Sequence, residues 1–556
     1  MEYAFDRFLR YDEMNEWLDA VVAAHPQLAS IESYGTSHEG RDLRIVTITD
    51  AATGTHDSKP AMWVDASIHS VELTATVAAC SLIDRLVNGF GADDTITRAL
   101  ATRTFYIVPR VNPDGAEWAL ADTPRFRRSS TRDWPWTDGH AWPGLHREDI
   151  DGDGRILQMR IEDPAGAWMT HADDQRLMVM IPAEGAPSGT TTYRLLDEGR
   201  VEDHDGFTIP TPRAVQGLDL NRNYPAGWST SVPGAGDHPL SEPEIDALVR
   251  AMVSRPNICG FNAYHTSGGV LLRPSSTRPD SKLAPRDVWA WKQLGEIGTE
   301  LTGYPSHSVY EDFTWDPSET MSGASDDWAY EHLGVFSWTT EFWDIVQAAT
   351  GEKQSVHFWY TGPTPTQELA VLRWCDEHQP DGYGPWTPFE HPDLGTVEIG
   401  GWNSLITWAN PTGDRLRAEV APHADFAVHQ ALCSPCLEIH QLLVNPLGED
   451  TWRVDVGVAN TGWLPTDVST LARKEGIVGP VTVEVGGNSV EVVDGPVKRR
   501  VGQLEGRIEL RFRDGNDGTP DRAMVSFVVR GAAGVEVDVA AVHPRAGSVR
   551  RTVALG

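Results

Sequence analysis

The chain has 556 residues, a hydrophobic fraction of 40% and a formal net charge of −34, which arises from 46 basic and 80 acidic residues. This length is sufficient for two or three domains, and the apolar content is typical of globular proteins. The negative charge opposes binding to nucleic acid or to an anionic membrane, so we expect neither as a partner. Adaptation to salt or to a GC-rich genome is the simpler explanation of the acidity, ahead of attraction of cationic ligands.

Three further features bear on cellular location. No segment approaches the roughly 20 apolar residues that span a bilayer. The first residues, MEYAFDRFLRYDEMNEW, lack the basic and then apolar regions of a signal peptide. The five cysteines are too few for a disulfide framework in so long a chain. Together these features predict a cytoplasmic protein, and they leave its oligomeric state open.

The first part of the chain alternates strand and helix patterns. Helical patterns occupy residues 12–24, 72–87 and 241–253, and strand patterns with few charges occupy 43–49, 61–68, 104–109, 257–265 and 335–342. Alternation of this kind predicts an α/β domain, and strands with few charges are typical of the buried centre of a sheet. We place this domain at residues 1–385.

Two later segments differ from that pattern. Residues 129–216 are rich in Trp, Asp, Gly and Pro, and we interpret them as a long insertion that covers the α/β domain. After a turn-rich hinge we expect a helical connector over 386–436. Residues 437–556 contain short strands of period two separated by turns, which predicts an all-β sandwich.

A candidate metal site begins at His69 and Glu72, where a predicted strand gives way to a helix. A His-x-x-Glu pair is a weak signal by itself in a chain with 19 histidines. His265, at the end of another strand pattern, supplies a third ligand. Two imidazoles and a carboxylate are suitable ligands for a catalytic zinc ion, which keeps its fourth position open. The sequence therefore predicts one zinc ion at these three residues.

Further polar residues suit hydrolysis at such a site. Asp219 could orient a ligand imidazole, and Asn221 with Arg222 could bind a carboxylate. Glu341 could take a proton from the attacking water. Arg127, in the segment PRFRRSSTR, could stabilise the oxyanion of a tetrahedral intermediate.

These motifs occur in a particular order: HSVE (69–72), NPDG (112–115), DLNRNYPAGW (219–228), AYH (263–265) and SDDWAYEHLGVFSWTTEF (325–342). That order resembles the M14 family of zinc carboxypeptidases over most of residues 1–380. The resemblance implies a mixed eight-stranded sheet flanked by helices, and release of C-terminal amino acids from peptides with a free carboxylate. The implied roles are zinc ligation by His69, Glu72 and His265, general base catalysis by Glu341, carbonyl polarisation by Arg127, carboxylate binding by Asn221 and Arg222, and support of the first histidine by Asp219.

Two positions bear on the substrate. Ungapped counting from Glu341 places Asp326 at the position that sets side-chain preference in the family, and an acid there resembles members that remove Lys or Arg. A helix N-cap or loop aspartate is the competing interpretation. Glu319 stands where the family carries a mobile tyrosine, and neither Tyr310 nor Trp315 matches it. Two alternatives therefore stay open: a zinc amidase of peptidoglycan or γ-glutamyl peptides on the same scaffold, and a catalytically inactive binding protein.

Two other clusters have ligand-like spacing. Asp149, Asp151 and Asp153 resemble the first half of a calcium loop, but Arg160 stands where a full loop has its bidentate glutamate. A solvated acidic turn is the simpler interpretation, and a structural Ca²⁺ is the alternative. The second cluster lies near the end of the expected connector and combines two cysteines with two histidines. Its spacing is that of a metal knuckle or a redox pair, although buried cysteines are commonly packing residues. Its members are His429, Cys433, Cys436 and His440.

Overall fold

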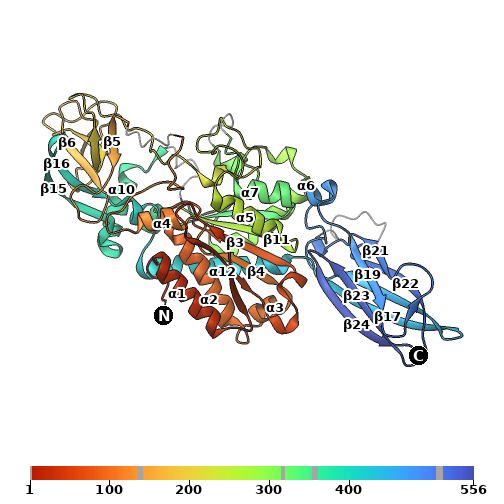
Figure 1. Ribbon diagram of the computed structural model, residues 1–556. Coiled ribbons are helices and arrows are strands. Elements are labelled where there is room, and N and C mark those ends of the chain that lie inside the picture. The colour runs from red at the N-terminus through yellow and green to blue at the C-terminus, as the bar shows by residue number, and fades with distance from the viewer. Residues whose placement is uncertain (1–2, 136–141, 315–319, 354–360, 509–517) are drawn as a thin grey trace.

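The computed structural model describes residues 3–135, 142–314, 320–353, 361–508 and 518–556. A central α/β region lies between two β-rich regions at opposite ends of the molecule (Figure 1). Within the described residues, no helix combines the length and apolar character required to cross a bilayer.

An eight-stranded sheet forms the centre of the molecule, with strand order β1-β2-β4-β3-β11-β14-β12-β13. Neighbours from β4 through β3 and β11 to β14 run parallel, whereas β1, β2 and β4 pair antiparallel and β12 is antiparallel to β14. The predicted mixed central sheet is thereby confirmed. The strands are β1 (Ala29–Thr36), β2 (Asp42–Ile48), β3 (Ala61–Ala66), β4 (Thr104–Val108), β11 (Ile258–Thr266), β12 (Val270–Arg273), β13 (Ser306–Ser308) and β14 (Phe336–Phe342).

Helices cover both faces of this sheet because its central strands are apolar on both sides. In β3, Met62 and Val64 belong to one hydrophobic core and Trp63 to the other, as expected for side chains that alternate across a strand. The first core is completed by α1 (Tyr11–Ala24), α2 (Leu73–Gly89), α3 (Asp94–Thr102), α6 (Pro285–Thr302), α10 (Pro365–His378) and α12 (Gly413–Cys433), and the second by α5 (Pro243–Val253) and α7 (Ser325–Trp328). Shorter helices are α4 (Pro113–Ala119), α8 (Ile345–Thr350) and α11 (Ser404–Thr407).

The predicted insertion forms a β region together with strands from much later in the chain. Its six-stranded sheet has the order β15-β16-β6-β9-β7-β8, and a separate pair joins β5 to β10. Leu157 and Met159 pack there against Val397 and Ile399. The strands are β5 (Gly144–Arg147), β6 (Gln158–Glu162), β7 (Trp168–Thr170), β8 (Met178–Met180), β9 (Tyr193–Asp197), β10 (Gly199–Glu202), β15 (Tyr383–His391) and β16 (Gly395–Trp402).

This arrangement corrects the helical connector that we expected at 386–436. Its first part contributes β15 and β16 to the insertion's sheet, because antiparallel pairing of β16 with β6 completes the hydrogen bonding of both strands. Its second part contains α12, but α12 belongs to the α/β region. Leu416, Val420 and Phe426 on this helix are buried in the core against α2 and α6.

The C-terminal region consists of two four-stranded antiparallel sheets that share one apolar core. Its strands and helix are β17 (Leu437–Gly448), β18 (Thr451–Asn460), α13 (Thr470–Glu475), β19 (Val481–Gly486), β20 (Glu491–Val492), β21 (Lys498–Gly502), β22 (Arg522–Arg530), β23 (Glu536–His543) and β24 (Gly547–Ala554). Asp287 of α6 accepts hydrogen bonds from the backbone N–H groups of Thr470 and Leu471, at 2.8 and 3.1 Å. The buried Arg545 guanidinium donates to the carbonyl oxygens of Leu333 and Gly334. The all-β region is therefore bound to the α/β region by buried polar contacts.

Candidate active site

The site lies at the carboxyl ends of β3, β11 and β14, three adjacent parallel strands. His69 follows β3, His265 lies near the end of β11, and Glu341 lies near the end of β14. His265 is the register partner of Glu341. Parallel strands bring their carboxyl ends to one edge of the sheet, and three separate parts of the sequence meet there for this reason.

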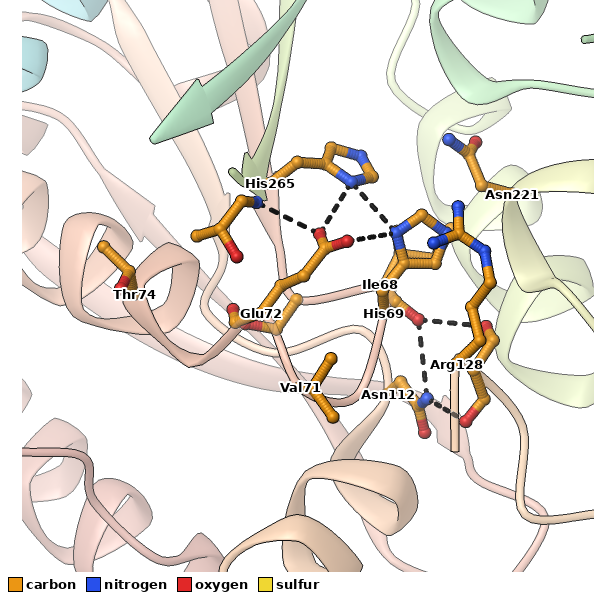
Figure 2. Close-up of polar contacts among 12 residues, drawn as sticks. Ile68, His69, Val71, Glu72, Thr74, Asn112, Arg128, Asn221 and His265 are labelled. Atoms are coloured by element: carbon orange, nitrogen blue, oxygen red, sulfur yellow. Dashed lines mark hydrogen bonds and ion pairs between the residues drawn. The ribbon is translucent and has the colours of Figure 1, made fainter. Parts of the chain in front are cut away.

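The three predicted metal ligands converge on one point (Figure 2). His69 Nδ1 lies 2.7 Å from Glu72 Oε1, and His265 Nδ1 lies 2.9 Å from Glu72 Oε2. The two Nδ1 atoms are 3.2 Å apart. Tetrahedral zinc with bonds of about 2.0–2.1 Å would keep its ligand atoms about 3.3 Å apart, so the donor set and its spacing fit a zinc ion. Burial raises the pKa of Glu72, but the two imidazoles outweigh that effect and lower it overall.

The loop that carries His69 is fixed by its neighbours. The Ser67 hydroxyl donates to the Glu72 carbonyl at 3.0 Å, so the chain turns sharply between β3 and α2. Asn112 of the NPDG motif donates to the Ser129 carbonyl at 2.6 Å. The Ser70 N–H donates to the Arg128 carbonyl at 3.0 Å. The loop after α4 is therefore attached to the loop that holds the first metal ligand.

Asp219 links His69 to an arginine. Its Oδ1 lies 3.1 Å from His69 Nε2, and its Oδ2 accepts from Arg128 Nε at 2.7 Å. Burial raises the pKa of Asp219, but the charges of Arg128 and His69 reverse that effect and hold it well below its usual range. The ionised carboxylate accepts a hydrogen bond from Nε2–H, which leaves Nδ1 of His69 available as a ligand.

Glu341 and Asp326 are the described carboxylates that line this cavity without belonging to the ligand cluster, and Glu341 is the register partner of His265. Burial raises the pKa of Glu341 to about 8, with a further contribution from the neighbouring Glu72 carboxylate and an opposing one from His265. A carboxylate with a raised pKa is a stronger base than an exposed one, which suits proton transfer from water.

The structure separates Arg127 from this site and places Arg128 there instead. Arg127 Nε donates to Gln216 Oε1 at 2.7 Å, and its Nη1 donates to the Phe126 carbonyl. Arg128 lines the cavity that contains the ligands, and Figure 2 shows its guanidinium beside His69. The polarising role that we expected of Arg127 stays a prediction, and this geometry favours Arg128 for it, because the bond to Asp219 holds Arg128 at the ligand cluster. The segment PRFRR contains three arginines, Arg125, Arg127 and Arg128, and the residues alone do not distinguish their roles.

The predicted substrate-binding residues line the same cavity, which has a volume of about 200 Å³. Asn221 Oδ1 accepts from the Ser325 N–H at 2.9 Å, and Arg222 Nη1 donates to the Asn221 carbonyl at 2.7 Å. Asp326 is 3% exposed and stands in the cavity wall at the start of α7, where burial raises its pKa. The adjacent Asp327 instead accepts from the Ser276 N–H at 3.0 Å. Of the two aspartates in SDDW, Asp326 is the one that lines the cavity.

Three residues bear on the expected place of the mobile tyrosine. Trp315 and Glu319 lie outside the described residues. Tyr310 is described, and it is not among the residues that line the ligand cavity.

The acidic cluster forms a compact loop. Asp149 accepts from the N–H groups of Gly152 and Gly154, and one carboxylate oxygen each of Asp149, Asp151 and Asp153 lie within 4.8 Å of one another. The buried Glu198 accepts from the Ile150 N–H at 2.9 Å, a contact that the local sequence pattern did not indicate. The calcium site stays a prediction.

The residues of the second cluster do not form one four-ligand site among the described residues. Cys433 Sγ lies 3.5 Å from His429 Nε2, but His440 Nε2 lies 3.0 Å from Glu438 Oε2. Cys433 and Cys436 are both free thiols. Burial raises the pKa of the Cys433 thiol to about 12, with the nearby Arg103 opposing it, so the thiol is neutral and packs as an apolar group.

Comparison with known proteins identifies the class of this fold and site. The profile of the zinc carboxypeptidase family, peptidase M14, matches residues 14–146 and 173–359, more than half of the chain. The chain belongs to this family. A second profile, described only as a domain of unknown function, matches residues 436–554.

Individual relatives are distant. Carboxypeptidase A2 of Rattus norvegicus is 27% identical over 351 residues, which cover 60% of this chain and 61% of that protein. An inactive metallocarboxypeptidase, ECM14 of Saccharomyces cerevisiae, is 24% identical over 131 residues, or 24% of this chain and 30% of that protein. The crystal structure of thrombin activatable fibrinolysis inhibitor has 18% identity and a TM-score of 0.38, and covers 66% of this chain and 73% of that chain. The chain spans less than two thirds of the length of the curated relatives that it matches first.

Proposed function

We propose that this protein is an active zinc carboxypeptidase that hydrolyses the last peptide bond of a substrate with a free C-terminal carboxylate. One observation carries the proposal: the zinc-ligand cluster, Glu341, Arg128, Asn221 and Arg222 all line one cavity. An inactive relative shows that the family fold alone does not ensure catalysis. The retained carboxylate at Glu341 therefore supports activity more strongly than family membership does.

Each side chain has a distinct task in the proposed reaction. Zinc, when bound, supplies a Lewis acid that activates water and polarises the scissile carbonyl. Glu341 accepts the proton of the attacking water and passes it to the leaving amine. Arg128 stabilises the negative charge that develops on the carbonyl oxygen. Asp219 keeps Arg128 in place and sets the tautomer of His69.

Asn221 and Arg222 are proposed to bind the terminal carboxylate. The side-chain oxygen of Asn221 is occupied by the Ser325 N–H, which leaves its NH₂ group as a donor. The Arg222 guanidinium adds a charged donor in the same cavity. Donors of both kinds suit a carboxylate, because charge-assisted hydrogen bonds to it are short and strong.

Asp326 supports a preference for substrates that end in Lys or Arg. A buried carboxylate without a cationic partner is costly, and the side chain of such a substrate would supply that partner. The N-cap interpretation has less support, because the N-cap residue of α7 is Ala324 and Asp326 lies inside the first turn.

The test is a release assay on peptide pairs with free and amidated C-termini, ending in Lys, Arg, Phe, Leu, Asp or Glu. We expect release from the free peptides only, fastest for Lys and Arg, and loss of release with a zinc chelator. Equal cleavage of free and amidated peptides would contradict the carboxypeptidase assignment and support the zinc amidase. No cleavage of any peptide by the zinc-loaded protein would support the binding-protein alternative.

Cytoplasmic location remains part of this proposal. The five unpaired cysteines support it, since oxidising compartments favour disulfides. Fractionation of cells that express the native chain tests it, and recovery from the culture medium would contradict it.

A further inference from the structure

A second and larger cavity adjoins the metal site. Its volume is about 820 Å³, and it shares the lining residues Arg128, Arg222 and Met321 with the metal cavity. Arg127 and Arg213 line it as well, so four arginines meet around one space. Arg213 comes from the insertion, whereas the other three belong to segments that hold the catalytic groups. We call this space the arginine cavity, defined by Arg127, Arg128, Arg213 and Arg222.

The arginines in this cavity outnumber the carboxylates. Asp219 is the sole acid among the described lining residues, and it is already bound to Arg128 and His69. Arg127 donates to the amide oxygen of Gln216 and to a backbone carbonyl, and Arg222 donates to the backbone carbonyl of Asn221. Three of the four guanidinium groups therefore lack an ion pair with any described carboxylate.

Arg213 shows the lack of a counter-charge most clearly. No carboxylate of the described residues lies within ion-pair distance of it, and its guanidinium carbon stands 5.8 Å from the centre of the Trp134 ring. It is exposed to solvent at the rim of the arginine cavity. By contrast, Arg250, which is also exposed, pairs with Asp246 at 2.8 Å.

Folding alone does not account for this arrangement. Like charges that share one space repel each other, and burial together with the neighbouring Arg125 lowers the pKa of Arg127. The chain has 80 acidic residues and a formal net charge of −34, so it contains many acidic side chains that could have paired with these arginines. A cluster of four arginines around one cavity, with a single carboxylate among its described lining residues, is the arrangement expected of a site that receives an anion from outside.

The relation of the two cavities indicates which part of a peptide would occupy this site. Asn221 and Asp326 line the metal cavity and not the arginine cavity, so the C-terminal residue is assigned to the metal cavity. Arg128, which faces the scissile carbonyl in the proposed reaction, stands where the two cavities meet. The residues that precede the scissile bond therefore extend toward the arginine cavity.

The geometry points to a site in the arginine cavity for an acidic side chain of the substrate, carried by one of the residues that precede the scissile bond. This inference rests on the proposed carboxypeptidase function. The substrate class is a peptide whose C-terminal residue follows a segment with glutamate or aspartate. Arg213 makes the insertion part of substrate selection, since no other residue of the arginine set comes from it.

The test compares peptides that share one C-terminal residue and differ by Glu or Gln at each of the three preceding positions. For at least one position we expect kcat/KM to be about three- to tenfold higher with Glu, the range of one or two partly exposed ion pairs. Arg213→Gln should bring that ratio close to one, and Arg213→Glu should bring it below one. Arg250→Gln is the matched control, an exposed arginine far from both cavities, and should keep the wild-type ratio. Raising the salt concentration should reduce the ratio, because screening weakens exposed ion pairs.

A binding measurement separates this inference from the proposed function. The same peptide pairs are titrated against the zinc-loaded protein by calorimetry, with the Glu341→Gln variant used where turnover interferes. If no peptide is cleaved but the Glu peptides bind more tightly and Arg213→Gln removes the difference, the carboxypeptidase proposal fails and the acidic-side-chain site stands. Equal binding and equal cleavage of Glu and Gln peptides at all three positions would overturn the site, whatever the outcome for peptide release.

Discussion

At the scale of single residues, the site depends on which of two neighbouring arginines faces the ligands. Arg128 is bound to Asp219 beside the metal cavity, whereas Arg127 is bound to Gln216. We predict that Arg128→Ala lowers kcat by about 10²–10³-fold, the usual cost of losing a donor to the oxyanion. Arg127→Ala should lower kcat much less for a neutral peptide. Steady-state kinetics of both variants decide the assignment, and a larger loss in Arg127→Ala would restore the interpretation made from the sequence.

Glu341 carries the second prediction. Replacing it with Gln keeps the shape of the side chain but removes the base, so kcat should fall by about 10²–10⁴-fold. The zinc content, measured by atomic absorption, should stay at one ion per chain because Glu341 is not in the ligand cluster. Retained hydrolysis by a zinc-loaded Glu341→Gln variant would exclude the proposed mechanism.

Asp326 carries the third prediction. Asp326→Asn removes the charge proposed to pair with a basic side chain but leaves a residue of equal size. For peptides ending in Lys or Arg, kcat/KM should fall by about tenfold or more, since a buried charge pair is lost. For peptides ending in Phe or Leu it should change little or rise. A uniform fall across all peptides would indicate a structural role at the start of α7.

Most of the site could be predicted at this scale, and the exceptions have physical causes. The metal ligands were identifiable because zinc restricts the ligand types and the motifs fix their order. Arg127 and Arg128 have the same chemistry and adjacent positions, so only the bond to Asp219 distinguishes them. Arg213 and Glu198 were not found because their roles arise from contacts across long sequence distances.

At the scale of elements, α6 and α13 join the α/β region to the C-terminal β region. The Asp287 carboxylate accepts the Thr470 N–H at 2.8 Å, the Leu471 N–H at 3.1 Å and the Tyr330 hydroxyl at 2.9 Å. In Asp287→Asn an NH₂ group replaces one of the two carboxylate oxygens. This NH₂ group then faces an N–H or O–H donor that has lost its acceptor. We predict a loss of about 1–3 kcal/mol in the free energy of unfolding.

Urea unfolding followed by tryptophan fluorescence measures this loss. Asp414→Asn is the matched control, because the Asp414 side chain is 97% exposed and its one ion pair, with Arg417, is long at 3.6 Å. Its effect should stay within about 0.5 kcal/mol. Equal effects of the two substitutions would show that the contact between α6 and α13 contributes nothing particular to stability.

The sequence predicted elements of the central sheet better than those of the peripheral sheet. β3, β11 and β14 are buried on both faces, so their apolar runs are recognisable without knowledge of their neighbours. β15 and β16 contain Pro, Gly and charged residues, and their burial pattern is mixed. Pairing with a distant part of the chain makes them strands, and no local pattern reports such pairing.

At the scale of the whole molecule, the net charge should make stability depend on salt. The formal charge of −34 favours expansion of the chain by self-repulsion, and added salt screens it. We predict that the urea midpoint rises as NaCl increases from about 0.1 to 1 M, over which the screening length shortens from about 10 to 3 Å. KCl should act equally if screening is the cause. A midpoint that falls with either salt would contradict this account of the acidity.

The sheet shared by the insertion and the later strands has a consequence for synthesis of the chain. β6 pairs with β16, and Arg160 bonds to Glu398, which lies 238 residues further along. During translation β6 leaves the ribosome long before β16 exists, and in that interval one of its edges has no partner in the final sheet. A nascent chain that stops before residue 395 thus presents an open strand edge in this peripheral sheet. The six-stranded sheet at this end of the molecule can be completed only after the ribosome has synthesised β16.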